Sequence, residues 1–276
     1  IATGIAKLLE EDLTIRYENN AETKQMCIYG LGEMHIDVIT SKLKNRFGTT
    51  VTISPAKVPY RETIKKKVQV EGKHKKQSGG HGQYGHVKIE FSPGTTDGLE
   101  FTETIFGGSV PKNFHPAVEK GLQESMAKGV LAGYPVIGIK ANLFDGSYHD
   151  VDSSEMSFKL AANLAFKEGM KQGGAVLLEP VGELRVSIPT SYSGDIMGDI
   201  SKRRGRIMGM SESGRKGFTV IEAEVPSAEM GTYAIQLRAM TQGRGSYSFN
   251  FVRYEEAPAE VAAKVIEAAK KEAAVE

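Results

Sequence analysis

The stretch from residue 182 to residue 253 constrains the fold most, because short strand patterns alternate there with amphipathic helical patterns in the order βαββαβ. This order is the split βαβ plan of ferredoxin-like domains. We therefore expect an α+β domain of that type. Its expected strands are 183–188, 207–210, 218–226 and 246–252, and its expected helices are 193–203 and 227–241.

The first 56 residues follow the same plan without its leading strand. A helical pattern with Ile5, Leu8 and Leu9 on one face opens the sequence, which begins at Ile1 without a methionine. The order αββαβ predicts a second ferredoxin-like domain that is truncated at its N-terminus. The elements expected after the first helix are strands at 13–17 and 25–29, a helix at 32–47 and a strand at 50–54.

A third domain is expected between these two, because Pro55 and Pro59 open a stretch of different character that closes near Pro180. A last amphipathic helix at 258–274 must dock on a domain, since an isolated helix of this length is marginal in water. The chain is therefore expected to be an α+β protein of three domains. Strands of the middle domain are expected at 65–71, 86–91, 99–104 and 136–143, and helices at 116–128 and 154–171.

Composition excludes several classes of protein. Cys27 is the single cysteine among 276 residues, which excludes a disulfide framework and a cysteine-based zinc site. No run approaches the roughly 18–20 apolar residues of a membrane span. The formal net charge of +1 argues against a protein that coats nucleic acid with its whole surface. We expect a soluble, cytoplasmic protein.

The segment GGHGQYG at 79–85 contains the G-x-G-x-x-G spacing at Gly80, Gly82 and Gly85. A dinucleotide site needs an apolar strand before this motif and a helix after it, whereas here a polar run precedes it and a strand follows. The P-loop signature G-x-x-x-x-G-K-[ST] is also absent from the sequence. The segment is therefore a glycine-rich tip between two strands, either a flexible turn or a place where a partner's backbone comes close.

Lysines gather immediately before this tip, in the run KKKVQVEGKHKK at 65–76. A solvated strand edge accounts for part of such a run. Lysines beside a glycine tip favour contact with phosphate, and Gln77, His81 and Tyr84 offer hydrogen bonds or stacking, so RNA is the expected ligand. A second basic cluster, also expected to bind RNA, could instead complement a helix dipole. It consists of Lys202, Arg203, Arg204 and Arg206.

The segment GSYHDVDSSE at 146–155 carries possible metal ligands, but one histidine without a cysteine makes a poor metal site. Asp152 with Glu155 three residues later is typical of the start of a helix. This leaves Tyr148 and His149 on an exposed turn. We expect neither a metal site nor a catalytic residue, because no serine or cysteine nucleophile has a recognisable setting.

Long motifs in one order resemble the C-terminal half of translation elongation factor G. The resemblance covers essentially the whole chain. It implies the family's third domain at 1–56 and its fifth at 179–253, both ferredoxin-like. The fourth, at 57–178 with 254–276, would be a βαβ-type domain similar to ribosomal protein folds. The motifs are GLGEMHIDV at 30–38, YRETI at 60–64, QSGGHGQYGHV at 77–87, GSYHDVDSSE at 146–155, GDISKRRGRIMGM at 198–210 and LRAMTQGRGSYSF at 237–249.

The resemblance implies a monomeric, ribosome-binding part of a translational GTPase that promotes translocation of transfer RNA and messenger RNA. The fourth domain would enter the decoding site as a wedge and the fifth would lie against ribosomal RNA. The third would couple nucleotide state to this arm. GTP and magnesium would bind in a domain absent from this chain, which itself would hold no cofactor. The implied RNA-binding residues are Gln77, Ser78, Gly79, Gly80, His81, Gln83, Tyr84, Ser147, Tyr148, His149 and Asp150 at the tip, and Lys73, Lys75, Lys76, Lys202, Arg203, Arg204, Arg206 and Arg238 in the basic clusters.

Two positions depart from the family's pattern. His81 stands where the family usually has arginine, which removes a permanent positive charge and weakens phosphate attraction. Gly231 stands where an aromatic residue is usual, which favours an elongation factor G-like paralogue over the principal translocase. Two alternatives stay open, namely a ribosomal protection protein, disfavoured by the 146–155 tip, and a stand-alone RNA-binding protein.

Overall fold

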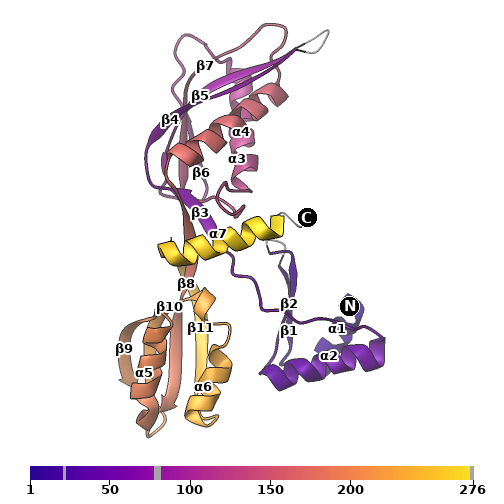
Figure 1. The fold of residues 1–276 in the computed structure, drawn as a ribbon, viewed down its shortest axis with the longest axis vertical. Helices are drawn as coiled ribbons and strands as arrows, with labels where there is room; N and C mark the ends of the chain where they lie inside the picture. Colours follow the sequence, from indigo (N-terminus) through magenta and orange to yellow (C-terminus); the bar gives the residue numbers. More distant parts are fainter. Residues whose placement is uncertain (21–22, 78–81, 274–276) are drawn as a thin grey trace. The chain divides into compact units, whose positions relative to one another are not determined.

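The computed structural model describes residues 1–20, 23–77 and 82–273, whose strands form three sheets (Figure 1). The chain divides into two compact units. One comprises residues 1–59 and 179–255, which carry a sheet each, and the other comprises residues 60–178 and 256–276. We call the second the middle unit. None of the described helices is both long and apolar enough to cross a membrane.

Residues 1–59 form two helices and a two-stranded antiparallel sheet. Ile5 and Leu8 of the first helix pack against Ile39 and Leu43 of the second in a small core. The second helix ends at Gly48, which adopts a left-handed conformation with φ of 64°. The elements are α1 (Ala2–Glu11), β1 (Arg16–Asn20), β2 (Gln25–Tyr29) and α2 (Glu33–Phe47).

The strand expected at 50–54 is wrong, since these residues are extended but pair with no other strand among those described. Ile53 is 55% exposed, so no sheet face covers its side chain. The closing strand of a split βαβ sheet pairs with the leading strand, and the described residues before α1 hold no leading strand. A strand pattern without a ladder partner stays outside the sheet.

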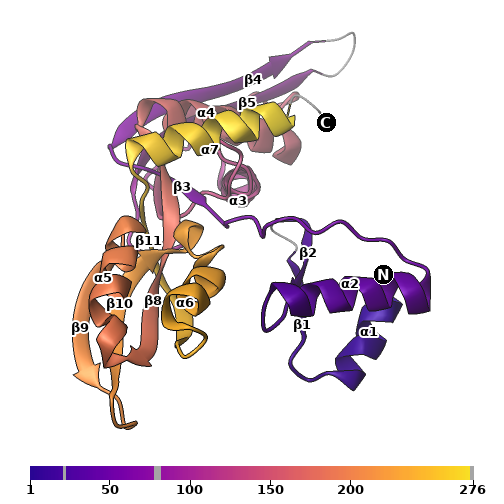
Figure 2. The same ribbon diagram turned by 60° about the horizontal axis from the view of Figure 1, so that its bottom comes forward.

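Residues 179–255 confirm the expected βαββαβ order. Their sheet has the strand order β11-β8-β10-β9, in which β10 runs antiparallel to both neighbours (Figure 2). Ile196 and Ile200 of α5 and Leu237 of α6 pack into one core with the strands. The elements are β8 (Ala175–Pro189), α5 (Ser193–Lys202), β9 (Arg206–Glu212), β10 (Phe218–Pro226), α6 (Tyr233–Thr241) and β11 (Ser246–Glu256).

The helix expected at 227–241 divides into a 3-10 turn at Ser227–Glu229 and α6. Gly231 lies between them and is exposed. Glycine costs about 1 kcal/mol relative to alanine inside a helix, so the pattern breaks where it stands.

The middle unit has a four-stranded sheet in the order β4-β5-β7-β6, with β6 parallel to β7 and the other pairs antiparallel. The crossover from β6 to β7 passes through α3, which gives the expected βαβ unit. The elements are β3 (Arg61–Ile64), β4 (Val68–Lys76), β5 (Gln83–Pro93), β6 (Leu99–Glu103), α3 (His115–Met126), β7 (Ile139–Ser147), α4 (Glu155–Gln172) and α7 (Ala259–Ala273).

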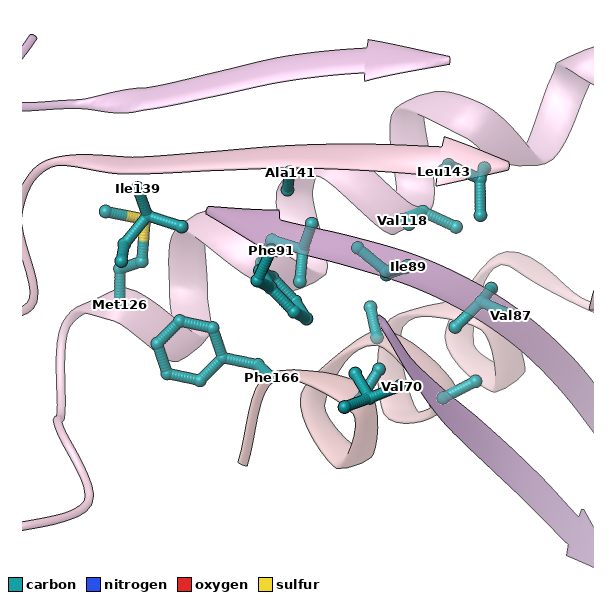
Figure 3. Packing of buried hydrophobic residues seen from close by; sticks show 14 of the residues in the cluster. Val70, Val87, Ile89, Phe91, Val118, Met126, Ile139, Ala141, Leu143 and Phe166 are labelled. Carbon is teal, nitrogen blue, oxygen red and sulfur yellow. The ribbon is translucent and has the colours of Figure 1, made fainter. Parts of the chain in front are cut away.

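The core of the middle unit lies between this sheet and the helices α3 and α4. Phe91 meets Phe166 edge to face with ring centroids 6.1 Å apart, and Val118 of α3 is fully buried (Figure 3). β3 pairs with residues 175–178 at the start of β8, and the backbone N–H of Ala257 donates to the carbonyl of Leu177 at 2.9 Å.

Two glycines allow α4 to lie directly on the hairpin formed by β4 and β5. A Cβ atom at Gly72 would come 2.1 Å from the carbonyl oxygen of Ala161. A Cβ atom at Gly85 would come 2.4 Å from the carbonyl oxygen of Ser157. The third glycine of the G-x-G-x-x-G spacing therefore has a packing role in this structure.

Glu62 is a buried carboxylate that organises a loop of the middle unit. Its side chain is fully buried and accepts hydrogen bonds from the backbone N–H groups of Leu131 and Ala132 at 2.9 Å and of Tyr134 at 3.2 Å. These three hydrogen bonds replace the water that the carboxylate loses on burial and so offset the free-energy cost of burying it.

Candidate nucleic-acid interface

The hairpin of β4 and β5 carries part of the predicted basic cluster on the strand itself. The polar run after residue 72 is expected to lie outside a strand, but the structure extends β4 to Lys76. The register places Lys73 opposite His86 and Lys75 opposite Tyr84. Gly72 faces α4, so the alternation of side chains puts Lys73 and Lys75 on the opposite face of the sheet.

The lysines of the run 65–76 differ in their partners. Lys65 pairs with Glu256 at 2.7 Å and Lys67 with Glu90 at 2.8 Å. Lys73, Lys75 and Lys76 are exposed, and within the described residues no carboxylate lies within ion-pairing distance of them. The end of β4 therefore carries positive charge that is not neutralised by the described part of the chain.

Tyr84, Ser147 and His86 form a polar network on the same face as Lys73. The hydroxyl groups of Tyr84 and Ser147 are 2.7 Å apart, and Nδ1 of His86 lies 2.6 Å from the Ser147 hydroxyl. Burial lowers the pKa of His86, whose Nε2 lies 2.9 Å from the Glu71 carboxylate. The Lys73 ammonium lies 5.8 Å from the centre of the Tyr84 ring, within range of a cation–π contact.

The segments 82–84 and 149–153 are interlocked, although about 70 residues separate them. The Tyr84 N–H donates to the carbonyl of Asp152 at 2.8 Å, and the Gly82 N–H donates to Oδ1 of Asp152 at 2.9 Å. The hydroxyl of Ser153 donates to the carbonyl of Tyr84 at 2.9 Å and accepts from the His149 N–H at 2.9 Å. The two tip segments therefore share one hydrogen-bond framework.

The interpretation of Asp152 as the start of a helix is wrong. The N-cap of α4 is Ser154, whose hydroxyl accepts from the Ser157 N–H at 3.2 Å. The carboxylate of Asp152 is turned to Gly82 instead. An acid followed three residues later by Glu155 is present in the sequence, but it does not mark the first residue of the helix here.

The other predicted tip residues are distributed around this framework. His149 has a side chain that is 55% exposed, and Tyr148 is 45% exposed. Gln77, Gln83 and Asp150 are exposed, and Gln83 Oε1 lies 2.8 Å from Nε2 of His74. Ser78, Gly79, Gly80 and His81 lie outside the described residues.

The possible metal ligands of the 146–155 segment do not converge. Nδ1 of His149 lies 3.6 Å from Oδ2 of Asp152, which makes a pair and not a cluster. Across the described residues, no three side chains of the metal-binding types are grouped so that they could hold an ion.

The second basic cluster has partners within residues 179–255. Arg203 pairs with Asp199 at 2.9 Å, and Arg206 pairs with Glu224. Hydrogen bonds with Glu179 raise the pKa of the Arg204 guanidinium, which also contacts Glu229 at 3.0 Å. Lys202 on α5 and Arg238 on α6 are exposed.

Sequence reasoning overlooked Ser153 and the role of Asp152. Both act through contacts with residues 82–84, and no local pattern encodes a contact of that sequence separation. The one available signal was Gly82, because a glycine inside a polar tip marks a close approach of another group. A Cβ atom at Gly82 would lie 2.9 Å from Oδ2 of Asp152.

Comparisons with known proteins match every part of this architecture. Family models match in succession, as Elongation Factor G, domain III (residues 1–55), Elongation factor G, domain IV (56–174) and Elongation factor G C-terminus (176–265). The chain is 48% identical over 273 residues to an elongation factor G-like protein of Thermotoga maritima. This match covers 99% of the present chain and 40% of the Thermotoga protein.

A similar solved structure is a protein of Thermus thermophilus, with a TM-score of 0.87 and 42% identity over 98% of this chain. The match covers 40% of that protein. The chain thus spans 40% of the length of both relatives.

Proposed function

The chain belongs to the elongation factor G family, three consecutive domains of which it contains, and on this premise we propose that it is the ribosome-binding part of a translational GTPase. Its role is to promote the movement of transfer RNA and messenger RNA during elongation. Its binding partners are the ribosome, transfer RNA and messenger RNA, and it acts as a monomer in the cytoplasm. GTP and magnesium bind elsewhere in the full-length protein, since the P-loop signature does not occur in this sequence.

The observation that carries this proposal is the end of the β4–β5 hairpin. Lys73, Lys75 and Lys76 lack carboxylate partners within the described residues, whereas Lys65 and Lys67 of the same run are ion-paired. Phosphate groups would supply the missing negative charge. Tyr84 lies beside Lys73, and the rings of Tyr84 and His149 have centroids 6.4 Å apart. These two side chains offer a hydroxyl group and an imidazole to RNA.

Within this proposal the tip acts by shape and hydrogen bonding. The family's fourth domain, which we place at 57–178 and 254–276 and which includes the middle unit, enters the decoding site and holds the codon–anticodon duplex against backward slippage. No bond is made or broken by its residues. Residues 179–253 lie against ribosomal RNA and residues 1–56 couple the nucleotide state to the arm. We assign RNA contact there to Lys202 and Arg238, because Arg203, Arg204 and Arg206 already have carboxylate partners. The Arg238 guanidinium donates to the carbonyl of Leu31 but has no carboxylate partner among the described residues.

The parent protein is proposed to be an elongation factor G-like paralogue. The relative at 48% identity is named an elongation factor G-like protein, and Gly231 occupies a position where the family usually has an aromatic residue.

Chemical footprinting of ribosomal RNA tests the proposal, with this chain added to ribosomes that carry transfer RNA and messenger RNA. We expect protection at the decoding site and at the factor-binding centre, and we expect His149→Ala to reduce the decoding-site protection. Absence of protection at both places, at low salt and millimolar magnesium, would contradict the proposal for this chain. Protection at RNA sites unrelated to either place would favour a general RNA-binding protein.

A further inference from the structure

We propose that Asp152 is a positioning residue that fastens the two tip segments together and fixes His149 as a hydrogen-bond donor toward RNA. The part that concerns RNA rests on the proposed function, whereas the fastening stands on the structure of the middle unit alone.

The fastening depends on two oxygen atoms of Asp152. Oδ1 accepts from the Gly82 N–H at 2.9 Å and the backbone carbonyl accepts from the Tyr84 N–H at 2.8 Å. Oδ2 lies 3.6 Å from Nδ1 of His149, which is beyond hydrogen-bond distance, so it takes no part in the fastening. The carboxylate side chain is only 20% exposed, so water competes weakly for these positions.

Gly82 is the counterpart that makes this arrangement possible. A Cβ atom there would lie 2.9 Å from Oδ2 and 3.0 Å from Cγ of Asp152, closer than van der Waals contact allows. A Cβ atom at position 82 would therefore make the Asp152 side chain shift, at the expense of the hydrogen bond that it accepts from the Gly82 N–H. The glycine and the aspartate act as a pair.

His149 is oriented from the same loop. Its Nδ1 accepts from the backbone N–H of Asp152 at 3.2 Å and of Val151 at 3.3 Å. A ring nitrogen that accepts carries no proton, so the proton of the neutral imidazole sits on Nε2. The backbone N–H of His149 donates to the hydroxyl of Ser153 at 2.9 Å. The exposed ring thus presents an N–H donor, and its partner in RNA is an acceptor, namely a phosphate, hydroxyl or carbonyl oxygen.

Nuclear magnetic resonance of this chain tests the fastening without a ribosome. In Asp152→Ala we expect the Gly82 amide hydrogen to exchange with solvent at least about tenfold faster, since a hydrogen bond to a charged acceptor is lost. The ¹⁵N shifts of His149 should show a protonated Nε2 in the unaltered chain. In the variant we expect a mixture of tautomers, because the loop backbone that donates to Nδ1 is no longer tied to Gly82. Asp97→Ala is the control, because Asp97 is exposed on a loop away from the tip segments.

Unchanged exchange at Gly82 in Asp152→Ala, in a variant whose other amides keep their spectrum, would overturn the fastening. Protonated Nδ1 in the unaltered chain would overturn the orientation of His149. If Asp152→Ala loses the whole spectrum of the middle unit, the variant has not folded, and the same exchange measurement is made on Asp152→Asn. This variant keeps Oδ1 but removes the charge, and we expect intermediate exchange at Gly82 for it.

Ribosome binding tests the consequence for RNA, with two matched substitutions of His149. His149→Gln keeps an N–H donor near the position of Nε2, whereas the shorter amide of His149→Asn reaches only the position of Nδ1 and leaves that of Nε2 without a donor. We expect His149→Gln to bind within about threefold of the unaltered chain and His149→Asn to bind about tenfold more weakly. Asp152→Ala should resemble His149→Asn.

Equal binding of all three variants and the unaltered chain would overturn the role toward RNA, even if the fastening is observed. If the unaltered chain does not bind ribosomes at all, the proposed function fails for this chain, and the resonance measurements still decide whether Asp152 fastens the tip.

Discussion

The guanidinium of Arg204 donates two hydrogen bonds to the carboxylate of Glu179, at 2.7 and 2.9 Å, and Glu179 is 3% exposed. Arg204 belongs to a basic cluster that from sequence favours RNA, yet its first partner is a buried acid of its own domain. A buried charge that loses its partner is strongly destabilising. The position therefore matters for the stability of residues 179–255 before it can matter for binding.

Replacing Arg204 by alanine is expected to lower the free energy of unfolding by about 3–5 kcal/mol, because Glu179 would stay buried without a counter-charge. Replacing the neighbouring Lys202 by alanine is expected to change it by less than about 0.5 kcal/mol. Thermal and urea unfolding followed by circular dichroism would measure both. Equal, small effects would show that the pair contributes nothing to stability.

Removing the three unpaired lysines of β4 is expected to weaken ribosome binding and to flatten its salt dependence. Each lysine that neutralises a phosphate contributes about 0.7–0.9 to the slope of log affinity against log salt. The triple variant of Lys73, Lys75 and Lys76 to alanine should therefore lose about two to three units of slope if all three lysines contact phosphate. Binding measured over a range of potassium concentrations gives this slope.

The matched control for that experiment changes three exposed lysines of the middle unit that lie off the hairpin, Lys112, Lys128 and Lys140, to alanine. It alters the net charge by the same amount. If both triple variants lose the same slope, the effect is one of total charge, and contact of the hairpin with phosphate is contradicted.

Glu62→Ala is expected to destabilise the middle unit by about 3 kcal/mol or more, because three backbone N–H groups lose their acceptor in a buried place. Glu62→Gln should cost less, since it keeps one acceptor oxygen. Urea unfolding of the two variants would show which has the lower free energy of unfolding. A stability equal to that of the unaltered chain for Glu62→Ala would contradict the role of this carboxylate.

Gly85→Ala is expected to destabilise the middle unit by about 2 kcal/mol or more, because the new methyl group would meet the backbone of α4 at Ser157. Gly98→Ala is the control, as no atom lies within 4 Å of a Cβ built there. The measurement is the melting temperature of each variant, which we expect to fall for Gly85→Ala and to change little for Gly98→Ala. Similar values for both would mean that α4 shifts at no cost.

Acid is expected to remove a stabilising contribution of Asp145. The hydrogen bond from Lys88, helped by the N–H of Gly146, lowers the pKa of Asp145 to about 2. A depressed pKa contributes stability above the unfolded value of about 4, and this stability is lost as the pH falls toward 2. The difference in melting temperature between the chain and Asp145→Asn should therefore shrink from pH 7 to pH 3. A constant difference would contradict this linkage.

The order of elements could be predicted where a pattern and its partners lie close in sequence. The alternation within 182–253 predicts β8, β9, β10 and β11, because each of these strands finds a ladder partner in the same stretch. It gives no sign of β3, which pairs with the start of β8 from outside that stretch. The strand expected at 50–54 fails for the converse reason. Its apolar pattern is real, but Ile53 has no leading strand to pair with among the described residues.

The site was predictable in its residue types and less so in their roles. Lysines beside a glycine tip indicate an anion, and Lys73, Lys75 and Lys76 do lack acidic partners in the described part of the chain. The arginines at 203, 204 and 206 look equivalent in sequence, yet the carboxylates that pair with them lie between 4 and 25 positions away. Partner choice at such separations follows from the tertiary fold, which a local pattern does not encode.

The middle unit is built from two pieces of chain that are far apart in sequence. Lys65 and Glu256, whose side chains pair at 2.7 Å, are 191 positions apart, and α7 belongs to the later piece. During synthesis residues 60–178 emerge first, and a whole further domain must be made before α7 exists. The middle unit therefore exists for a time without α7. The rate of translation sets how long this incomplete form is exposed to proteases and chaperones.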